Sequence, residues 1–423
     1  MSGPPRVVIL GGGFAGLHLV RWLERRLRRG EADVTLIDRN DYHLFTPLLY
    51  QVATGELPPH AVAYPLRRAT AHARFSFVKT EAEAIDTEAR LVRTADGPFA
   101  YEHLVLVPGS VTNDYGIPGV REYALPLKLL VDAERVRRRI LDSFESAVVE
   151  RDPVRRRELL TFAIIGAGPA GVETASSIRD LMDHSLRPMH RSIDFDRDVT
   201  IVLVDGSDRV IPQMDRRLSR LASKRLAQQK VQVMLRTMVT EVRPGSVRMK
   251  DGRELRAGTI VWAGGVRTHP LVAGLDGLAH ARDGRVTVDR TFQAGGRGDV
   301  LAFGDAAYME WRGTPLPQLA QVATLQAPIV AANIAHLIRG ELLVPYEHKP
   351  KGDLIALGRT QAGANMLRLG PVPTGNIVFG GFPAWAAWRV NYLLQLLGVR
   401  NRATLLMEWT LSYFITRMVA NTP

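Results

Sequence analysis

The stretch that decides the fold is Val7-Val8-Ile9-Leu10-Gly11-Gly12-Gly13-Phe14-Ala15-Gly16. Its four leading apolar residues predict a buried parallel strand, and its glycines at 11, 13 and 16 fit the spacing G-x-G-x-x-G ahead of a helix. In such a unit the first glycine makes a tight turn, the second lets the backbone approach a pyrophosphate, and the third packs the helix on the strand. One copy alone is a weak signal, because a purely structural α/β turn carries the same glycines.

An acidic residue strengthens this interpretation. The strand predicted over 34–37 ends in Asp38, about 20 residues beyond the last glycine, where a carboxylate would hold a ribose hydroxyl. The sequence therefore predicts a dinucleotide site formed by Gly11, Gly13, Phe14, Ala15, Gly16, Asp38 and Arg39.

The same pattern returns in the middle of the chain. A strand over 162–165 precedes Gly166-Ala167-Gly168-Pro169-Ala170-Gly171, and a strand over 199–204 ends in Asp205. The longer spacing to Asp205 is explained by the polar stretch 187–198, an insertion before the strand. Two dinucleotide turns in one chain predict a flavin and a nicotinamide that exchange a hydride.

Details of the second copy indicate a nicotinamide site. Its predicted residues are Gly166, Gly168, Pro169, Gly171, Asp205 and Gly264. Asp205 would repel a 2′-phosphate and so favours NADH over NADPH, while Arg209 nearby leaves NADPH open. The strand that ends at Gly264 mirrors an earlier strand that ends at Gly109, so the duplication extends beyond one loop.

A third acidic corner lies further along the chain. A strand predicted near 298–303 ends in Gly304-Asp305 at a helix start. This carboxylate could accept a hydrogen bond from a ribitol hydroxyl of a flavin whose adenine end lies at 11–16, and an N-cap aspartate is the alternative.

Composition narrows the class of protein. The 423 residues have room for two or three domains at roughly 150 residues each. The absence of cysteine excludes disulfides, thiolate metal sites and a redox-active cysteine pair, and we expect no metal.

The charge and the hydrophobic pattern bear on possible partners. The net charge of +12 comes without a nucleic-acid-binding motif, so we expect no nucleic acid partner. We expect no membrane-spanning helix, because no run of about 18 uncharged apolar residues is present, and no signal peptide before the first strand.

These motifs together resemble those of the type II NADH dehydrogenases, single-chain NADH:quinone oxidoreductases of the two-dinucleotide flavoprotein superfamily. The similarity covers essentially the whole chain. It lies in the segments 9–16, 48–55, 64–68, 165–173, 261–266, 302–305, 320–323 and 351–353.

The resemblance implies an α/β fold class with two Rossmann-like dinucleotide-binding domains and a C-terminal amphipathic helical region that associates with a membrane. The implied ranges are an FAD-binding domain over 1–120 and 291–345, a helical linker over 121–158, an NADH-binding domain over 159–290, and a membrane-association and dimer region over 346–423.

The resemblance also implies roles for single residues. FAD would be held non-covalently in the first domain and NADH in the second, and electrons would pass to a membrane quinone. Glu173 matches the glutamate between nicotinamide and flavin, and Gln321 matches the first glutamine of the quinone-site helix. A carboxylate near a helix N-terminus can order the nicotinamide or move a proton, and stabilisation of the helix dipole is the alternative.

One departure from the family concerns the quinone end. The family pattern Ala-Gln-x-Ala-x-Gln has two glutamines on one helix face, whereas here Leu325 takes the second position and Gln326 is displaced by about 100°. Pro328 follows and is expected to distort this helix. The departure leaves the identity of the acceptor open and does not affect the flavin chemistry.

The C-terminus carries two aromatic stripes at helical spacing. One stripe consists of Trp385, Trp388, Tyr392, Leu396 and Val399, and the other of Leu405, Trp409, Ser412 or Tyr413, and Thr416. Gly398 is expected to break the helix between them. A basic helix pair with tryptophans can lie in a membrane interface, and a helical hairpin packed on the body or on a second subunit is the alternative. The resemblance favours the membrane and implies dimer contacts.

We therefore expect a peripheral enzyme on the cytoplasmic side of the cell membrane. It would oxidise NADH, reduce quinone without pumping protons, and form a homodimer. Two alternatives stay open: a soluble NAD(P)H-dependent flavoprotein reductase that donates electrons to an iron–sulfur protein, and a redox-signalling flavoprotein with slow turnover.

Overall fold

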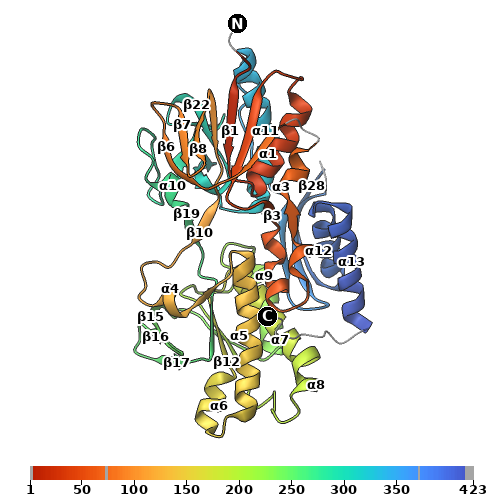
Figure 1. Ribbon diagram of the computed structural model, residues 1–423. Coiled ribbons are helices and arrows are strands. Elements are labelled where there is room, and N and C mark those ends of the chain that lie inside the picture. The colour runs from red at the N-terminus through yellow and green to blue at the C-terminus, as the bar shows by residue number, and fades with distance from the viewer. Residues whose placement is uncertain (1–2, 72–74, 370–371, 415–423) are drawn as a thin grey trace. The chain divides into compact units, whose positions relative to one another are not determined.

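The computed structural model describes residues 3–71, 75–369 and 372–414 (Figure 1). The chain forms two compact units, each assembled from three separate segments, and we describe them one at a time. Unit 1 consists of Met1–Leu44, Ala63–Val111 and Val266–Pro350, and unit 2 consists of Phe45–Val62, Thr112–Gly265 and Lys351–Pro423.

Unit 1 is built on a six-stranded sheet in the order β21-β22-β9-β1-β2-β5. Its strands are β1 (Arg6–Leu10), β2 (Asp33–Asp38), β5 (Ser76–Lys79), β9 (His103–Leu106), β21 (Gln293–Ala294) and β22 (Arg297–Ala302). All neighbours are parallel except β21 and β22. The buried strand expected over 7–10 is confirmed by β1, whose apolar residues are at most 2% exposed.

Two long helices of unit 1, α1 (Phe14–Arg26) and α11 (Ala320–Arg339), pack against each other. Pro328 does not end α11, which continues as one helix on both sides of it. The shorter elements of unit 1 are β3 (Tyr42–Leu44), β4 (Ala63–Pro65), α3 (Leu66–Thr70), β6 (Ala82–Asp86), β7 (Leu91–Thr94), β8 (Gly97–Ala100), α10 (Pro270–Ala273), β20 (Val286–Thr287), η4 (Gly304–Ala306), β23 (Ala307–Tyr308), β24 (Glu310–Trp311) and β25 (Thr314–Pro315).

Unit 2 contains a five-stranded parallel sheet in the order β11-β18-β12-β13-β14. Its strands are β11 (Leu125–Pro126), β12 (Thr161–Ile165), β13 (Thr200–Val204), β14 (Val231–Met234) and β18 (Thr259–Trp262). A separate antiparallel sheet is formed by β15 (Val239–Arg243), β16 (Ser246–Met249) and β17 (Glu254–Arg256).

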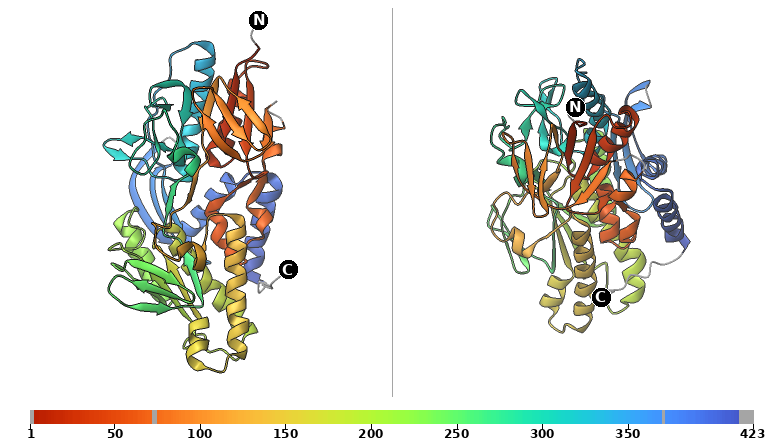
Figure 2. Two further views of the ribbon diagram at one scale, coloured as in Figure 1. Left: turned by 60° about the vertical axis from the view of Figure 1, so that its left-hand side comes forward. Right: turned by 45° about the horizontal axis from the view of Figure 1, so that its top comes forward.

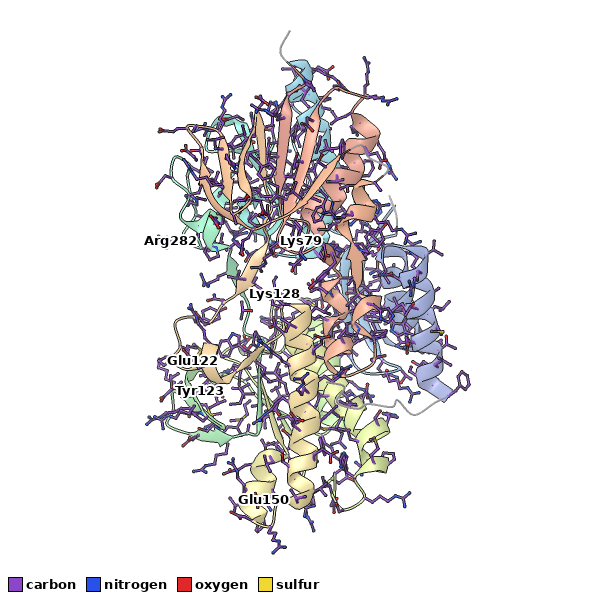
Figure 3. The ribbon with its side chains drawn as sticks, viewed as in Figure 1. Lys79, Glu122, Tyr123, Lys128, Glu150 and Arg282 are labelled. Carbon is purple, nitrogen blue, oxygen red and sulfur yellow. The ribbon has the colours of Figure 1, made fainter. Side chains whose placement is uncertain are left out.

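The helices of unit 2 include α5 (Leu130–Val149), which lies within the segment 121–158 that was expected to be helical. It packs against α6 (Pro153–Leu159), and both are yellow in Figure 2. Figure 3 labels Lys128 and Glu150, the residues that lie just before and just after α5. The other helices and turns of this part are η1 (Thr46–Leu48), α2 (Leu49–Ala53), η2 (Pro59–Ala61), α4 (Val120–Tyr123), α7 (Pro169–Leu181), η3 (Met182–Leu186), α8 (Arg187–Met189) and α9 (Arg216–Gln228).

The duplication expected from the sequence is confirmed by the topology. In unit 1 the first strand lies between the second and fourth, in the order β9-β1-β2-β5, and unit 2 repeats this with β18-β12-β13-β14. In both cases a glycine turn and a helix join the first strand to the second, and an antiparallel three-stranded sheet lies between the third and fourth strands along the chain.

The C-terminal segment completes unit 2. An antiparallel sheet of β26 (Gly352–Ala356), β27 (Ala362–Leu369) and β28 (Val372–Gly381) leads into α12 (Phe382–Gln395) and α13 (Val399–Phe414). The two helices meet at Gly398, whose φ is +83°, so the break expected there is confirmed.

A further short pair of strands is formed by β10 (Ser110–Thr112) and β19 (Val266–Thr268).

Candidate functional site

The three glycines of the first turn have different surroundings. A Cβ on Gly11, whose φ is +115°, would lie 2.1 Å from the carbonyl oxygen of Val107, and a Cβ on Gly16 would lie 1.8 Å from the carbonyl oxygen of Gly11. The packing of the protein itself therefore requires both glycines. A Cβ on Gly13 would meet nothing within 4 Å. Since no contact within the chain requires glycine at 13, this open space fits a pyrophosphate that approaches the backbone.

Asp38 stabilises this turn from the end of β2. Its Oδ2 accepts a hydrogen bond from the amide of Gly12 at 2.6 Å, and its Oδ1 accepts one from the amide of Asn40 at 2.7 Å. Burial raises the pKa of Asp38, and these two hydrogen bonds oppose that effect. Each carboxylate oxygen can accept a second hydrogen bond, so a ribose hydroxyl can still be bound. The neighbouring Arg39 is exposed, and its guanidinium lies 3.6 Å from Glu81.

A second loop of unit 1 lies beside the first turn. Gly304 has a φ of +64°, and a Cβ on it would lie 3.2 Å from Cβ of Ala323 and 3.4 Å from Cβ of Ala15. Its neighbour Asp305 accepts a hydrogen bond from the hydroxyl of Ser110 at 2.6 Å. The structure therefore brings together the glycine turn, the Gly304-Asp305 corner and the Gly109-Ser110 turn, as the predicted FAD site requires. Sequence reasoning missed Ser110, whose only signal is its position next to Gly109.

Gln326 explains part of the departure in α11. It is 3% exposed, and its Oε1 accepts a hydrogen bond from the amide of Gly304 at 2.9 Å. This glutamine therefore fixes the loop that carries Asp305. Gln321 lies on the first turn of α11 and is half-buried, as is Leu325.

The second glycine turn repeats the first in unit 2. A Cβ on Gly166, whose φ is +108°, would lie 2.3 Å from the carbonyl oxygen of Ala263, and one on Gly171 would lie 1.8 Å from the carbonyl oxygen of Gly166. A Cβ on Gly168 would meet only Nε2 of Gln213, at 3.7 Å. As in the first turn, the second glycine, Gly168, borders open space. Pro169 follows this glycine directly and begins α7.

Asp205 has the same relation to the second turn that Asp38 has to the first. Its Oδ2 accepts a hydrogen bond from the amide of Ala167 at 2.6 Å, and its Oδ1 accepts from the amide and the hydroxyl of Ser207. Arg209 donates to the backbone carbonyls of Pro212 and Met214, so its guanidinium is already bound within its own loop.

Gly264 closes the strand β18. A Cβ on it would lie 2.9 Å from the ring of Trp262, and its carbonyl oxygen accepts a hydrogen bond from the hydroxyl of Tyr115 at 3.0 Å. Trp262 in turn donates its indole N–H to the carbonyl of Asn113 at 2.7 Å. These contacts fix the loop that follows the fourth strand of unit 2.

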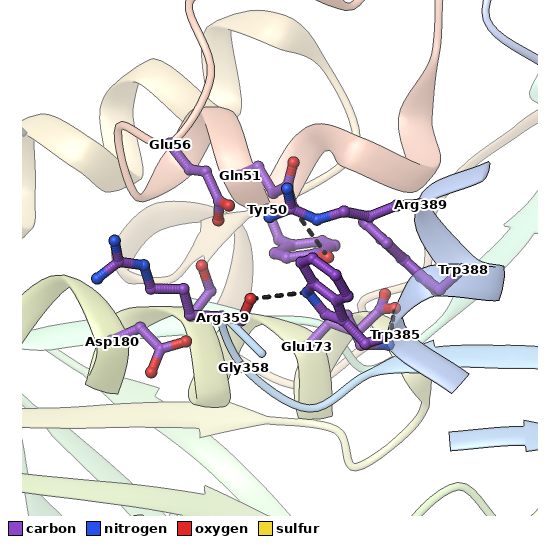
Figure 4. A pocket seen from close by; sticks show the side chains of 12 residues that line it. Tyr50, Gln51, Glu56, Glu173, Asp180, Gly358, Arg359, Trp385, Trp388 and Arg389 are labelled. Atoms are coloured by element: carbon purple, nitrogen blue, oxygen red, sulfur yellow. Dashed lines mark hydrogen bonds between the residues drawn. The ribbon is translucent and has the colours of Figure 1, made fainter. Parts of the chain in front are cut away.

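A pocket in unit 2 is assembled from all three of its chain segments (Figure 4). Its lining combines carboxylates, arginines and aromatic rings. The residues are Tyr50, Gln51, Glu56, Glu173, Ser177, Asp180, Ala356, Gly358, Arg359, Trp385, Trp388 and Arg389. The glutamate singled out from the sequence is among them.

Glu173 is 7% exposed, and its Oε1 accepts a hydrogen bond from the amide of Ala356 at 3.0 Å. Burial raises the pKa of Glu173 to about 8, and the hydrogen bond opposes this only in part. At neutral pH the side chain is therefore a neutral acid that can donate a proton. The helix-dipole alternative is not favoured, because Glu173 lies beyond the first turn of α7 and carries no charge at that pH.

Two buried tyrosines surround this acid. Burial raises the pKa of Tyr50 and of Tyr392, and the nearby Glu173 adds to both shifts. The hydroxyl of Tyr50 accepts a hydrogen bond from Nε2 of Gln51 at 3.4 Å, and Oε1 of Gln51 accepts one from the indole of Trp409 at 3.1 Å. A hydrogen-bonded chain therefore links α13 to the residues around Glu173.

Two arginines of the pocket lie over aromatic rings. The guanidinium of Arg389 is 4.4 Å from the ring centroid of Trp385 and 4.6 Å from that of Trp409. The guanidinium of Arg359 is 4.6 Å from the ring centroid of Tyr413. Such cation–π contacts hold both guanidinium groups over the aromatic rings of the pocket.

The aromatic stripes of the C-terminal helices face inward, which corrects part of the sequence interpretation. Trp388 is 2% exposed and Trp409 is 1% exposed, so neither can lie at a lipid interface. Val399 belongs to the second helix and is 85% exposed, and Thr416 lies outside the described residues. The exposed apolar face consists instead of Phe382, Val390, Leu394, Val399, Leu406, Met407, Leu411 and Phe414.

Among the described residues, one helix is long and apolar enough to cross a membrane, namely Ala320–Arg339. This helix is α11, and 56% of its apolar window is buried within the protein. Because it packs against α1 in unit 1, its composition is that of a core helix.

The fold and the two glycine turns are those of flavoproteins with two dinucleotide-binding domains, and comparison with known proteins supports this class. A model of the pyridine nucleotide-disulphide oxidoreductase family matches residues 5–327, so the chain is a member of that family. Since the chain contains no cysteine, it cannot use the disulphide of the family name.

Within this class, the chain belongs to the type II NADH:quinone oxidoreductases. It is 33% identical to Ndh of Mycobacterium tuberculosis, covering 98% of this chain and 90% of that protein. It is 30% identical to the enzyme of Haemophilus influenzae, covering 84% and 86%. Its fold is similar to NDH2 from Plasmodium falciparum solved in complex with NADH, with a TM-score of 0.88 at 18% identity over 99% of this chain and 100% of that chain.

The glycines of the second turn give a matched pair of variants. Gly168 has an ordinary φ of −69°, so Gly168→Ala should fold normally while its methyl group occupies the space a pyrophosphate would take. We expect the dissociation constant for NADH to rise about ten- to hundredfold, with an unchanged melting temperature. Gly171→Ala, whose Cβ would collide with a carbonyl oxygen, should lower the melting temperature or prevent folding. Equal NADH affinity in Gly168→Ala and the parent protein would contradict this assignment.

Proposed function

We propose that this protein oxidises NADH through a non-covalently bound FAD and passes the electrons to a membrane quinone without pumping protons. The observation that carries the proposal is the pair of glycine turns, each with open space at its second glycine, in a chain whose relatives are named type II NADH:quinone oxidoreductases.

Unit 1 offers the residues that would hold FAD. The pyrophosphate would lie at Gly13 and the N-terminus of α1, a ribose hydroxyl at Asp38, and a ribitol hydroxyl at Asp305. When bound, the flavin accepts a hydride and passes its electrons on.

In unit 2 the NADH pyrophosphate would lie at Gly168. Asp205 would bind the ribose and disfavour a 2′-phosphate.

The resemblance assigns Glu173 to the hydride-transfer face between nicotinamide and flavin, and we propose that it also supplies a proton when the acceptor is reduced. Reduction of a quinone to a quinol takes up two electrons and two protons, whereas a hydride from NADH supplies two electrons and one proton. Each turnover therefore consumes one further proton, and a buried neutral carboxyl beside the acceptor can deliver it. Gln321 on α11 remains our candidate in unit 1 for the quinone side.

The exposed apolar face of α12 and α13 supports membrane association. Val399 and Phe414 are 85% and 82% exposed, and the face also carries two leucines that are more than half exposed. We propose that this face enters the interfacial layer of the cell membrane on its cytoplasmic side, and that the protein acts there as a homodimer.

Stopped-flow absorbance of the purified protein in detergent tests the whole proposal. NADH should bleach the flavin band, and a short-chain quinone should restore it. Bleaching without restoration by any quinone would favour an iron–sulfur protein as acceptor or a slow redox-signalling role. Absence of a flavin band after reconstitution with FAD would overturn the proposal.

Glu173→Gln tests the proton donor, because the amide keeps the shape and cannot ionise. We expect restoration of the flavin band by quinone to slow by about 10²–10⁴-fold at neutral pH. In the parent protein the neutral acid is lost as pH rises through about 8, so the rate of this step should fall above that pH. The variant should show no such fall in its pH profile. Glu122→Gln, an exposed change in α4, should behave like the parent.

Replacement of Leu394 and Leu406 by serine tests the membrane face. Since burial of one leucine contributes roughly 1.5–3 kcal/mol, the double variant should partition into anionic lipid vesicles more than tenfold less well. Cosedimentation with vesicles measures this. The double change Val149→Ser and Val154→Ser removes two exposed apolar side chains elsewhere in unit 2 and should have no effect. Equal binding by both double variants would exclude α12 and α13 as the anchor.

A further inference from the structure

One face of α7 carries three polar side chains that line the pocket: Glu173, Ser177 and Asp180. Their spacing of four and then three residues places them on a single face of the helix. At 1.5 Å per residue the stripe extends about 10 Å along the helix. Figure 4 shows Glu173 and Asp180 at different ends of the pocket lining.

Exposure changes along this stripe. Glu173 and Ser177 are 7% and 4% exposed, whereas Asp180 is partly exposed. The hydroxyl of Ser177 lies 2.7 Å from the hydroxyl of Thr54, which donates to the backbone carbonyl of Tyr50 at 3.0 Å. The stripe therefore has a buried carboxyl at one end and a partly exposed carboxyl at the other, with a hydroxyl between them along the helix.

The backbone at Gly358 passes close to the carboxylate of Asp180. A Cβ on Gly358, whose φ is +108°, would lie 3.0 Å from Oδ2 of Asp180 and 2.9 Å from Nε2 of Gln229. Only glycine allows the turn between β26 and β27 to pass there. The same turn is fixed from α9, because Nε of Arg225 donates to the carbonyl of Leu357 at 3.1 Å.

A proton route to Glu173 follows from the reaction in the proposed function, on which this inference rests. Once Glu173 has given its proton to the reduced acceptor, its carboxylate must take another from water before the next turnover. Its burial prevents direct exchange with bulk solvent, so groups between it and the surface have to carry that proton.

We propose that Asp180 and Ser177 conduct this proton along α7 to Glu173. Asp180 takes a proton from water, the hydroxyl of Ser177 accepts a proton while it releases its own, and the carboxylate of Glu173 receives it. Water in the pocket bridges each step, and only O–H bonds break and form. Both residues act through Glu173 and not on the acceptor itself.

Other charged or titratable groups face this stripe and set its electrostatics. They are Tyr50 on α2, Glu56 after α2, Arg359 in the turn after β26, and Arg389 and Tyr392 on α12.

The experiment compares two half-reactions of the full-length, flavin-loaded protein in detergent. In Asp180→Asn and in Ser177→Ala, reduction of the flavin by NADH should stay within about twofold of the parent. Its restoration by a short-chain quinone should slow at least tenfold above neutral pH, less than the effect typical of removing the acid itself. The solvent deuterium isotope effect on that step should rise, and formate or imidazole in the buffer should restore part of the rate to Asp180→Asn.

Two further variants separate proton transfer from a structural effect. Asp180→Glu keeps the carboxyl and should recover most of the rate, and Asp183→Asn removes a nearby acid that pairs with Arg179 and Arg187 and should resemble the parent. Parent-like rates and isotope effects in both Asp180→Asn and Ser177→Ala would overturn the relay while leaving the proposed function intact. Failure of the parent protein itself to be reoxidised by quinone would overturn the proposed function instead.

Discussion

Both units depend on one steric constraint, the contact between the two ends of the glycine turn. In unit 1 the carbonyl oxygen of Gly11 occupies the space in which a Cβ on Gly16 would lie, so the helix can pack this closely only without a side chain there. Asp38 then binds the amide of Gly12 and ties the turn to the neighbouring strand. The same set of contacts recurs in unit 2, where Asp205 binds the amide that follows Gly166. What remains in each unit is an open space beside the second glycine, and this space suits a dinucleotide.

The pocket of unit 2 depends on a different constraint, the burial of a carboxyl group. Glu173 is removed from water by α2, β26 and the C-terminal helices. This burial raises its pKa to about 8, and the hydrogen bond from Ala356 opposes the rise only in part. A strongly shifted acid inside a cleft is typical of functional sites, because burial there adjusts the pKa of an acid to its chemical task. The first copy has no acid at the position that corresponds to Glu173, because His18 stands there. Glu173 therefore distinguishes the two copies chemically.

The C-terminal helices have two roles that their sequence does not separate. Their inward side places Trp388 and Trp409 against the pocket lining and holds Arg389 by cation–π contacts. Their outward side leaves Leu394 and Phe414 exposed. A hydrogen bond from Trp409 to Gln51 joins the last and the first of the three chain segments that form unit 2. The same two helices therefore contribute both to the surroundings of Glu173 and to the exposed apolar face.

The glycine turns, the acids that follow them and the duplicated order of strands could all be predicted from the sequence. These depend on steric rules between residues close in sequence, and the resemblance to a known family added the roles. Only the tertiary structure decided which side of α12 and α13 faces inward, that Gln326 binds the Gly304 loop, and that Ser177 and Asp180 share a pocket with Glu173. Helical periodicity defines a stripe but not its partner. The partner depends on contacts between segments far apart in the chain, and for these no local pattern exists.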